Sequence, residues 1–169
     1  MARGWSGPNE YREIVQIGAI KVDCERLAEE ADFSLLVRPI KNPQLSDYFV
    51  RLTQISQADV DAKGVTLTEA LERFYQWSEG LLLYCWGIDG KTMAENAALI
   101  EVPFPFEMSR FMNIREFFKE HGVPADNYMS STISEYFGIK PARRGHDALN
   151  DARSILDGLR GLRARIGAV

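Results

Sequence analysis

The chain has 169 residues, of which 46% are hydrophobic and 26% charged, and its formal net charge is −4. This size and composition predict a single domain covering residues 1–169, and they exclude a membrane span, which needs roughly 20 consecutive apolar residues. The two cysteines, Cys24 and Cys85, have a spacing typical of neither a metal site nor a disulfide framework, which favours a reducing cytoplasm.

The first predicted elements are two strands. Residues 14–22 are β-branched and apolar on both faces, which is typical of a short buried strand. Residues 33–38 form a second apolar run that ends before Pro39. The acidic residues 23–32 predict a loop between them, so the two strands would form a hairpin.

Helices are predicted next. Residues 56–64 begin with a serine and end with a glycine, which indicates a short capped helix. Thr66 and Glu69 form a capping box at the start of a run with helical apolar spacing that ends near Gly80. Residues 42–47 have the composition of a turn.

The second half of the chain alternates strands and helices. The apolar run at residues 81–86 indicates a buried strand. Further on, the pattern favours helices at 91–99, 115–121, 132–137 and 147–165, and a strand at 111–114. An antiparallel hairpin that leads into strands joined by helices predicts an α/β fold with a mixed β-sheet flanked by helices.

Two places carry candidate chemistry. Asp89 follows the predicted strand 81–86, and ligands of open α/β sheets bind outside the carboxyl ends of strands, although Asp-Gly is also a common turn. His146 and Asp151 lie at the start of the last helix, five positions apart and so about 140° apart on an ideal helix. They share a site only if His146 leans in from the loop. Alternatively, Asp147 caps the helix and Asp151 merely favours its N-terminal dipole.

The C-terminal segment is basic although the chain is acidic. Residues 138–169 hold seven Lys or Arg against three Asp. Such a segment can contact phosphates locally, but it lacks the electrostatic footprint of a protein that coats DNA. An ordinary solvated helix face is the alternative.

Several segments together resemble the DEDDh exonucleases, the DnaQ-like branch of the ribonuclease-H-like superfamily. Residues 12–20 resemble the second strand of that family, and residues 33–39 its third strand. Residues 45–47, 52–57 and 60–61 resemble one subgroup, the histone-mRNA and RNA-interference-linked exonucleases and the bacterial KapD-like proteins.

The motifs of the family follow in the expected order. Trp86-Gly87-x-Asp89, followed by Asn96, is similar to the second exonuclease motif. His146 with Asp151 is similar to the third, in which the histidine defines the class. The resemblance implies a ribonuclease-H-like exonuclease fold over residues 12–160.

The resemblance also implies roles for these residues in metal-dependent 3′→5′ hydrolysis. Asp151 and Asp89 would bind Mg²⁺ or Mn²⁺, hard cations that prefer oxygen ligands. His146 would be the general base that deprotonates the attacking water, and histidine, which titrates near pH 6.5, suits that role.

The implied partner is the 3′ end of RNA or of single-stranded DNA. Leu52, Thr53 and Ile55 would lie beneath the terminal nucleotide, and Arg143 or Arg144 would reach a phosphate.

One part of the family pattern is missing from the sequence. The first family motif is Asp-x-Glu, but no Asp-x-Glu precedes Ile14, where Glu10 and Glu13 are the only acids. We expect a sheet without its first strand and a nuclease that is impaired in this form, as a start position too far downstream would produce. The rivals are a non-catalytic descendant that binds nucleic acid or protein, and an unrelated α/β domain.

A missing first strand would leave a vacant lane between the strands at 14–22 and 81–86. Residues 1–10 could fill it, the two strands could pair directly, or a homodimer could complete the sheet. Gly4, Gly7 and Pro8 make residues 1–10 a poor strand, so the sequence favours pairing or dimerisation.

Overall fold

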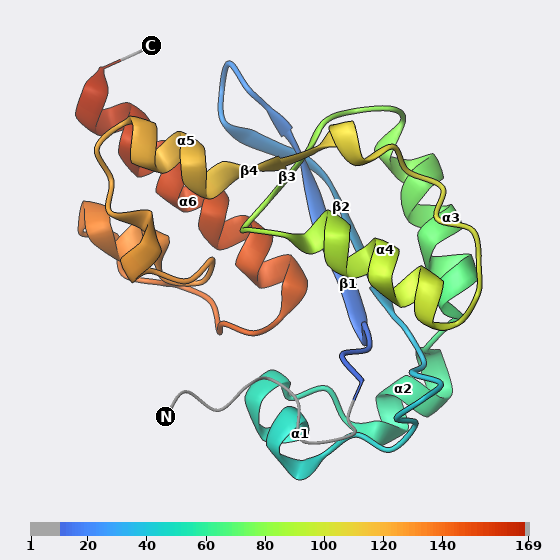
Figure 1. The fold of residues 1–169 in the computed structure, drawn as a ribbon. Coiled ribbons are helices and arrows are strands. Elements are labelled where there is room, and N and C mark those ends of the chain that lie inside the picture. Colours follow the sequence, from blue (N-terminus) through green and yellow to red (C-terminus); the bar gives the residue numbers. More distant parts are fainter. Residues whose placement is uncertain (1–10, 168–169) are drawn as a thin grey trace.

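The computed structural model describes residues 11–167, a mixed α/β fold of small sheets flanked by helices (Figure 1). In chain order its strands and α-helices are β1 (Gln16–Asp23), β2 (Ala28–Leu36), α1 (Asp47–Thr53), α2 (Gln57–Lys63), α3 (Leu67–Ser78), β3 (Leu83–Cys85), α4 (Asp89–Leu99), β4 (Phe111–Asn113), α5 (Ile114–Glu120) and α6 (Ala148–Ile166). Three 3₁₀ turns, η1 (Met108–Arg110), η2 (Ala125–Asn127) and η3 (Ile133–Phe137), complete the order. No helix among these residues is both long and apolar enough to cross a bilayer.

The β1–β2 hairpin is longer than predicted, and the predicted ten-residue loop is wrong. β1 and β2 pair antiparallel from Gln16↔Leu36 to Asp23↔Ala28, with a register shift between Lys21 and Val22. The acidic residues extend β2 because Arg153 of α6 binds both oxygens of Glu29 and one of Asp32. This partner, which lies far away in the sequence, is why local composition misled the prediction.

The arginines of α6 also hold the turn of the hairpin. Arg160 donates to the Leu27 carbonyl oxygen at 2.9 Å, and Arg163 donates to those of Glu25 and Arg26 at 2.7 and 2.9 Å. Arginines of the basic C-terminal segment therefore stabilise the hairpin turn and do not merely form a solvated helix face.

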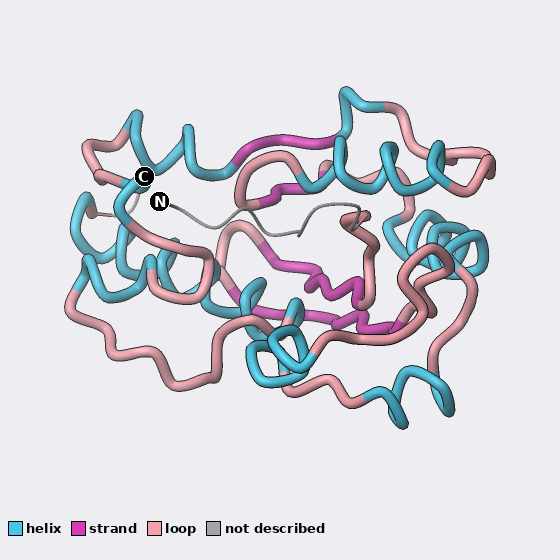
Figure 2. Tube along the Cα trace, turned by 60° about the horizontal axis from the view of Figure 1, so that its bottom comes forward, coloured by secondary structure: helices cyan, strands magenta, loops and turns pink. Residues whose placement is uncertain are grey.

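The two faces of the hairpin contact different helices. Ile17 and Phe33 belong to the main apolar cluster, which contains buried residues of α3 and α4. Gln16 and Gly18, on the other face, contact the beginning of α6. Figures 1 and 2 show α6 along one side of the strands and α3 and α4 on the other.

Short capping signals identified several helices correctly. Ser56 caps α2, and Thr66 caps α3 by accepting the N–H of Glu69. The predicted helix at 132–137 is the 3₁₀ turn η3, which Gly138 ends in the left-handed conformation. The helix α1 was not predicted from the sequence, although Ser46 is its N-cap and accepts the N–H of Phe49.

The strands form two separate pairs instead of one continuous sheet. Within residues 11–167, β1 pairs only with β2, and β3 pairs only with β4, in parallel. The expectation that β1 and β3 would pair directly is therefore wrong. The part of this expectation that concerns residues 1–10 lies outside the described residues, and dimerisation stays a prediction.

Asn96 of α4 binds the backbone just ahead of β1. Its side chain is buried, accepts the N–H of Ile14 at 2.9 Å and donates to the carbonyl oxygen of Arg12 at 2.9 Å. The chain ahead of β1 is thereby bound to α4. Asn96, which belongs to the second motif of the resemblance, thus joins α4 to the start of β1.

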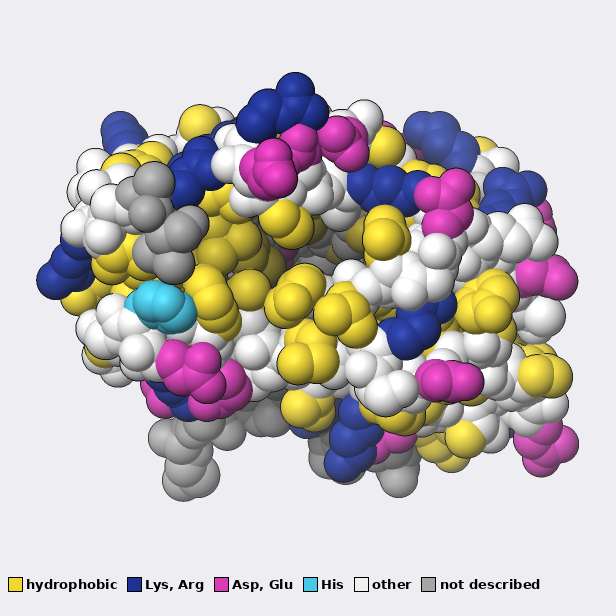
Figure 3. Space-filling model, turned by 90° about the horizontal axis from the view of Figure 1, so that it is seen from above, with side chains coloured by type: hydrophobic (Ala, Val, Ile, Leu, Met, Phe, Trp, Pro, Cys, Tyr) yellow, Lys and Arg dark blue, Asp and Glu magenta, His cyan; other side chains and the backbone are white. Residues whose placement is uncertain are grey.

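The apolar run at 81–86 is much less buried than predicted. Leu81 and Tyr84 are 52% and 57% exposed, and only residues 83–85 form a strand. Leu83 faces the main apolar cluster, while Tyr84 pairs in register with the exposed Met112. Figure 3 shows apolar side chains gathered around a hollow on the upper face of the molecule.

We predict that Gly18→Ala destabilises the chain by about 1–3 kcal/mol, the range for overpacking. A Cβ at Gly18 would lie 2.3 Å from the backbone nitrogen of Leu149 in α6. Without that contact, alanine would instead raise the free energy of unfolding by about 0.4–1 kcal/mol, because it reduces the conformational entropy of the unfolded chain. The sign of the change is therefore decisive. The measurement is urea unfolding, with Ser34→Ala on the paired strand as the control. Equal stability of Gly18→Ala and the parent chain would contradict the close approach of α6.

Candidate functional site

The candidate site begins where α6 starts. Asp147 is the N-cap of α6, and its Oδ1 accepts the N–H of Asn150 at 2.9 Å. Its Oδ2 accepts a hydrogen bond from Gln16 Nε2 at 3.0 Å, while Gln16 Oε1 accepts the N–H of Ala148 at 2.9 Å. One side chain of β1 therefore fixes the first turn of the helix. The capping role of Asp147 that the sequence left open is confirmed.

His146 precedes the helix in a conformation that few residues adopt. Its φ is +62°, in the left-handed region, where histidine is tolerated better than branched residues. Gly145 lies against Ser131, where a Cβ would come within 2.8 Å of the serine Cβ. The loop is thus pressed onto the segment that precedes η3.

Asp151 lies in the first turn of α6 and is half-buried. Its Oδ1 accepts the backbone N–H of His146 at 3.1 Å, and its Oδ2 accepts a hydrogen bond from the Ser130 hydroxyl at 3.1 Å. Burial raises the pKa of the Asp151 carboxyl, and the hydrogen bonds from Ser130 and His146 oppose that rise. The structure therefore brings two of the three predicted catalytic residues together, with His146 reaching Asp151 from the loop.

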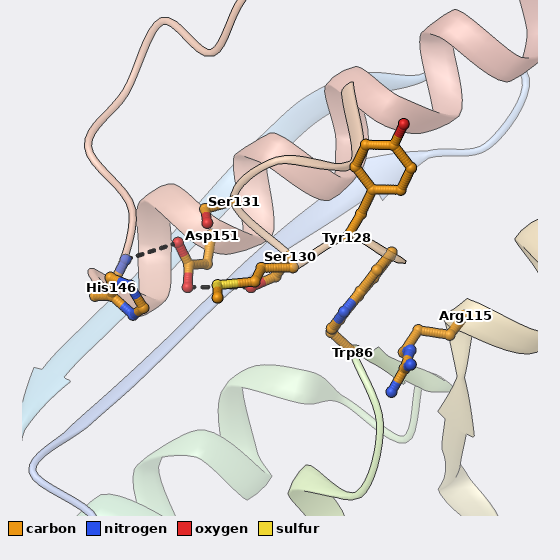
Figure 4. A pocket seen from close by; sticks show the side chains of 8 residues that line it. Trp86, Arg115, Tyr128, Ser130, Ser131, His146 and Asp151 are labelled. Atoms are coloured by element: carbon orange, nitrogen blue, oxygen red, sulfur yellow. Dashed lines mark hydrogen bonds between the residues drawn. The ribbon is translucent and has the colours of Figure 1, made fainter. Parts of the chain in front are cut away.

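His146 and Asp151 open onto a cavity of about 270 Å³. Figure 4 shows them at one end of it, Arg115 at the other end, and the rings of Trp86 and Tyr128 between. The remaining lining residues are Met129, Ser130 and Ser131. Aromatic faces beside polar groups suit a nucleobase that stacks while its backbone is held.

Asp89 begins α4, three residues after Trp86. Among residues 11–167, those that line the cavity include Trp86 but not Asp89. Asp89 keeps contact with solvent, yet partial desolvation raises the pKa of its carboxyl, opposed by a hydrogen bond from the Trp86 backbone. The metal-binding role that Asp89 would share with Asp151, implied by the family resemblance, stays a prediction.

The predicted nucleotide-binding residues Leu52, Thr53 and Ile55 are not among the described residues that line this cavity. Ile55 is buried in a small cluster with Val15 and Val60. The Thr53 hydroxyl donates to the Phe49 carbonyl oxygen and accepts the N–H of Ile55, while Leu52 is half-buried. Their proposed contact with a terminal nucleotide stays a prediction.

Of the two arginines proposed to reach a phosphate, only Arg144 is exposed. Arg143 forms an ion pair with Asp157 of α6 at 2.5 Å, and Asp157 also binds Arg160 at 3.0 Å. Arg144 is thus the more available of the two for a substrate phosphate.

Five residues that line the cavity were not predicted from the sequence: Arg115, Tyr128, Met129, Ser130 and Ser131. Tyr128 and Ser130 lie in irregular segments around η2 and η3, where periodicity gives no signal. Arg115 resembled any charged residue of an amphipathic helix. Only the tertiary arrangement of these segments distinguishes them.

Comparison with known proteins places the chain among nucleases. A model of the Exonuclease family (RNase_T) matches residues 5–158. The 3′-5′ exoribonuclease 1 of Rattus norvegicus is 26% identical over 160 residues, covering 88% of this chain and 46% of that protein. The 3′-5′ exonuclease eri1 of Schizosaccharomyces pombe is 25% identical over 175 residues, covering 85% of this chain and 58% of that protein. The chain thus spans about half the length of the curated relatives it matches.

Solved structures share the fold. The nuclease domain of 3′hExo, a DEDDh family member bound to rAMP, matches with a TM-score of 0.82 at 24% identity, covering 98% of this chain and 88% of that one. A 3′-exonuclease in a structure of 3′-end recognition of histone mRNA stem-loop matches with a TM-score of 0.81 at 22% identity, covering 98% and 78%. The predicted DEDDh exonuclease fold is confirmed.

We predict that Asp151→Asn raises the unfolding temperature at neutral pH by roughly 2–4 °C, the change that about 1 kcal/mol produces in a domain of this length. Because burial raises the folded-state pKa, the stability contributed by protonated Asp151 is lost as pH rises through that value. Asparagine removes this loss and can still accept from His146. The gain should vanish as the pH falls below 3.8, the ordinary value for aspartate.

Asp147→Asn is the matched control for Asp151→Asn. Its amide group would face Gln16 Nε2, so this variant should unfold at a lower temperature than the parent chain at neutral pH. Thermal unfolding followed by circular dichroism over a pH series measures both variants. A similar loss in Asp151→Asn would contradict a destabilising carboxylate.

Proposed function

Since this chain belongs to the Exonuclease family, we propose that it removes nucleotides from the 3′ end of RNA or single-stranded DNA by metal-dependent hydrolysis. The observation that carries the proposal is the shared cavity of His146 and Asp151, with Trp86 and Tyr128 beside them. A general base, a carboxylate and aromatic stacking surfaces are the groups that stepwise hydrolysis of a single strand needs.

Each residue that lines the cavity has its own role in the proposed reaction. The rings of Trp86 and Tyr128 hold the base by stacking, which tolerates any sequence. His146 accepts the proton of the attacking water, and its position ahead of α6 lets the ring reach the cavity while Asp151 holds its backbone. Asp151 would be a ligand of the cation.

The carboxylates of Asp89 and Asp151 provide the oxygen ligands that Mg²⁺ and Mn²⁺ prefer, but few such groups lie close together in the described structure. Within residues 11–167, no group of three His, Cys, Asp or Glu side chains could hold a metal ion. Mg²⁺ commonly uses one or two carboxylates and completes its shell with waters and substrate phosphates. Asp151, with Asp89 in support, would hold it in that way. When bound, the cation would stabilise charge on the phosphate and acidify water.

RNA is the favoured substrate class. The relative from Rattus norvegicus carries the name 3′-5′ exoribonuclease 1, and one structural neighbour is described as recognising the 3′ end of a histone mRNA stem-loop. We propose that this chain also acts at RNA 3′ ends, and we do not propose that it recognises the histone mRNA stem-loop.

A non-catalytic binding module is the second candidate function. The observation that favours it is that no group of three His, Cys, Asp or Glu side chains among residues 11–167 could hold a metal ion. Such a module would use the same cavity to hold a 3′ end without cleaving it.

We predict that the 169-residue chain trims 5′-labelled single-stranded RNA slowly in Mn²⁺. A form extended upstream to carry Asp-x-Glu should trim at least about 100-fold faster, since preorganised electrostatic groups contribute about 10²–10³ each. Asp151→Ala and His146→Ala in the extended form should abolish trimming, and Glu72→Gln, at an exposed position of α3, should not.

Two results would decide against parts of this proposal. Fast, EDTA-sensitive trimming by the 169-residue chain, lost in Asp151→Ala, would show that the given residues suffice. RNA that stays intact but bound in the presence of both forms would favour the binding module.

A further inference from the structure

Arg115 enters the cavity from the first turn of α5. Its backbone is fixed because the side chain of Asn113, the N-cap of the helix, accepts the N–H of Arg115 at 3.1 Å. The residue directly follows the strand–helix junction of β4 and α5. Its side chain therefore starts from a rigid position, and 28% of it is exposed.

The guanidinium of Arg115 has several N–H donors, and in the described structure only Nη2 has a protein partner. Nη2 binds Asp126 Oδ1 at 2.5 Å, and the group lies 5.9 Å from the centre of the Trp86 ring. The Nε of Arg115 is buried and, among residues 11–167, has no hydrogen-bond partner. A buried polar group without a partner costs about 1–3 kcal/mol, so the ion pair with Asp126 leaves the guanidinium incompletely satisfied.

A purely structural ion pair accounts poorly for this arrangement. Asp126 is 62% exposed and also binds Lys119 at 3.1 Å, so solvent and a second cation already stabilise its charge. Exposed pairs of this kind contribute little to stability, about 0–1 kcal/mol. The pair with Asp126 also makes no use of Nε.

The charges of the residues that line the cavity indicate what the Arg115 guanidinium would bind. Among the described residues that line it, Arg115 alone carries a permanent positive charge, and it lies at the end away from Asp151 (Figure 4). Arginine binds phosphate through several parallel N–H donors in a flat fork. A single strand whose reacting phosphate lies at Asp151 and whose base stacks on Trp86 or Tyr128 would bring a neighbouring backbone phosphate towards Arg115.

We propose that Arg115 binds a non-reacting backbone phosphate on the 5′ side of the linkage to be cleaved, and so sets how the strand enters the cavity. This inference rests on the proposed function. Arg115 is a substrate-binding residue in it, with no part in proton transfer.

The first experiment leaves the protein unchanged. Short single-stranded RNAs carry a charged, non-hydrolysable methylenephosphonate at the terminal linkage and a neutral methylphosphonate at one further linkage at a time. Fluorescence anisotropy with the 169-residue chain should show one internal position where neutralisation weakens binding about tenfold, the fold-change for losing one hydrogen bond to a charged group. Equal binding at every position would overturn the proposal.

The second experiment asks whether Arg115 reads that position. Arg115→Gln should weaken binding of the unmodified strand about tenfold and lower the salt dependence by about 0.7 in log–log slope, the value for one phosphate contact on a single strand. In the Arg115→Gln variant, the neutral linkage at that position should then cause no further loss of binding. Lys119→Gln is the matched control, since it removes the same charge from the same helix and the same carboxylate but lies outside the cavity lining.

Asp126→Asn separates a structural role from a binding role. It releases the guanidinium, so binding should stay equal or become tighter if Arg115 binds phosphate. A loss as large as that of Arg115→Gln would show that the ion pair merely shapes the cavity, and would overturn the proposal. If the parent chain binds no RNA at all, the proposed function fails with it, whereas binding that Arg115→Gln leaves unchanged overturns this inference alone.

Discussion

The site depends on how closely α6 approaches β1. Gly18 leaves room for the helix backbone, and the Gln16 amide group binds both the N-cap side chain and the first free N–H of the helix. Free N–H groups at a helix start must be satisfied, and here a strand residue satisfies one of them from 132 positions away. Because the anchor is rigid, the first turn of α6 can hold Asp151 and direct the preceding loop.

That anchoring sustains two unfavourable features at one place. His146 adopts a left-handed backbone and Asp151 is a carboxylate whose burial opposes its ionisation. Each costs free energy that the surrounding contacts must offset, and such costs concentrate where chemistry is performed. The Ser130 hydroxyl and the Gly145–Ser131 contact belong to the same arrangement. The cavity is therefore formed where the start of α6, the start of α5, the segment between η2 and η3 and the segment before α4 meet.

Features encoded by short segments could be predicted from the sequence, and features set by distant partners could not. Thr66 and Ser56 were recognised as helix caps because a cap acts within four residues. Glu29 was assigned to a loop because its stabilising partner, Arg153, lies 124 positions away. The pairing of His146 with Asp151 was predicted through the family motif, since helical geometry alone placed them apart. Arg115 and Tyr128 gave no local signal, because their meaning depends on the cavity that they share.

The hairpin is held by different forces at its two ends. Its base, below the register shift at Lys21 and Val22, packs on apolar residues, while its turn is held by arginines of α6 through carboxylates and carbonyl oxygens. Salt does not screen apolar packing and can even strengthen it, whereas exposed charge contacts weaken once the Debye length falls to a few ångströms, about 3 Å at 1 M. Ionic strength therefore acts selectively on this fold. At high salt the turn would open as a local unit while the base, and with it the start of α6, stays closed.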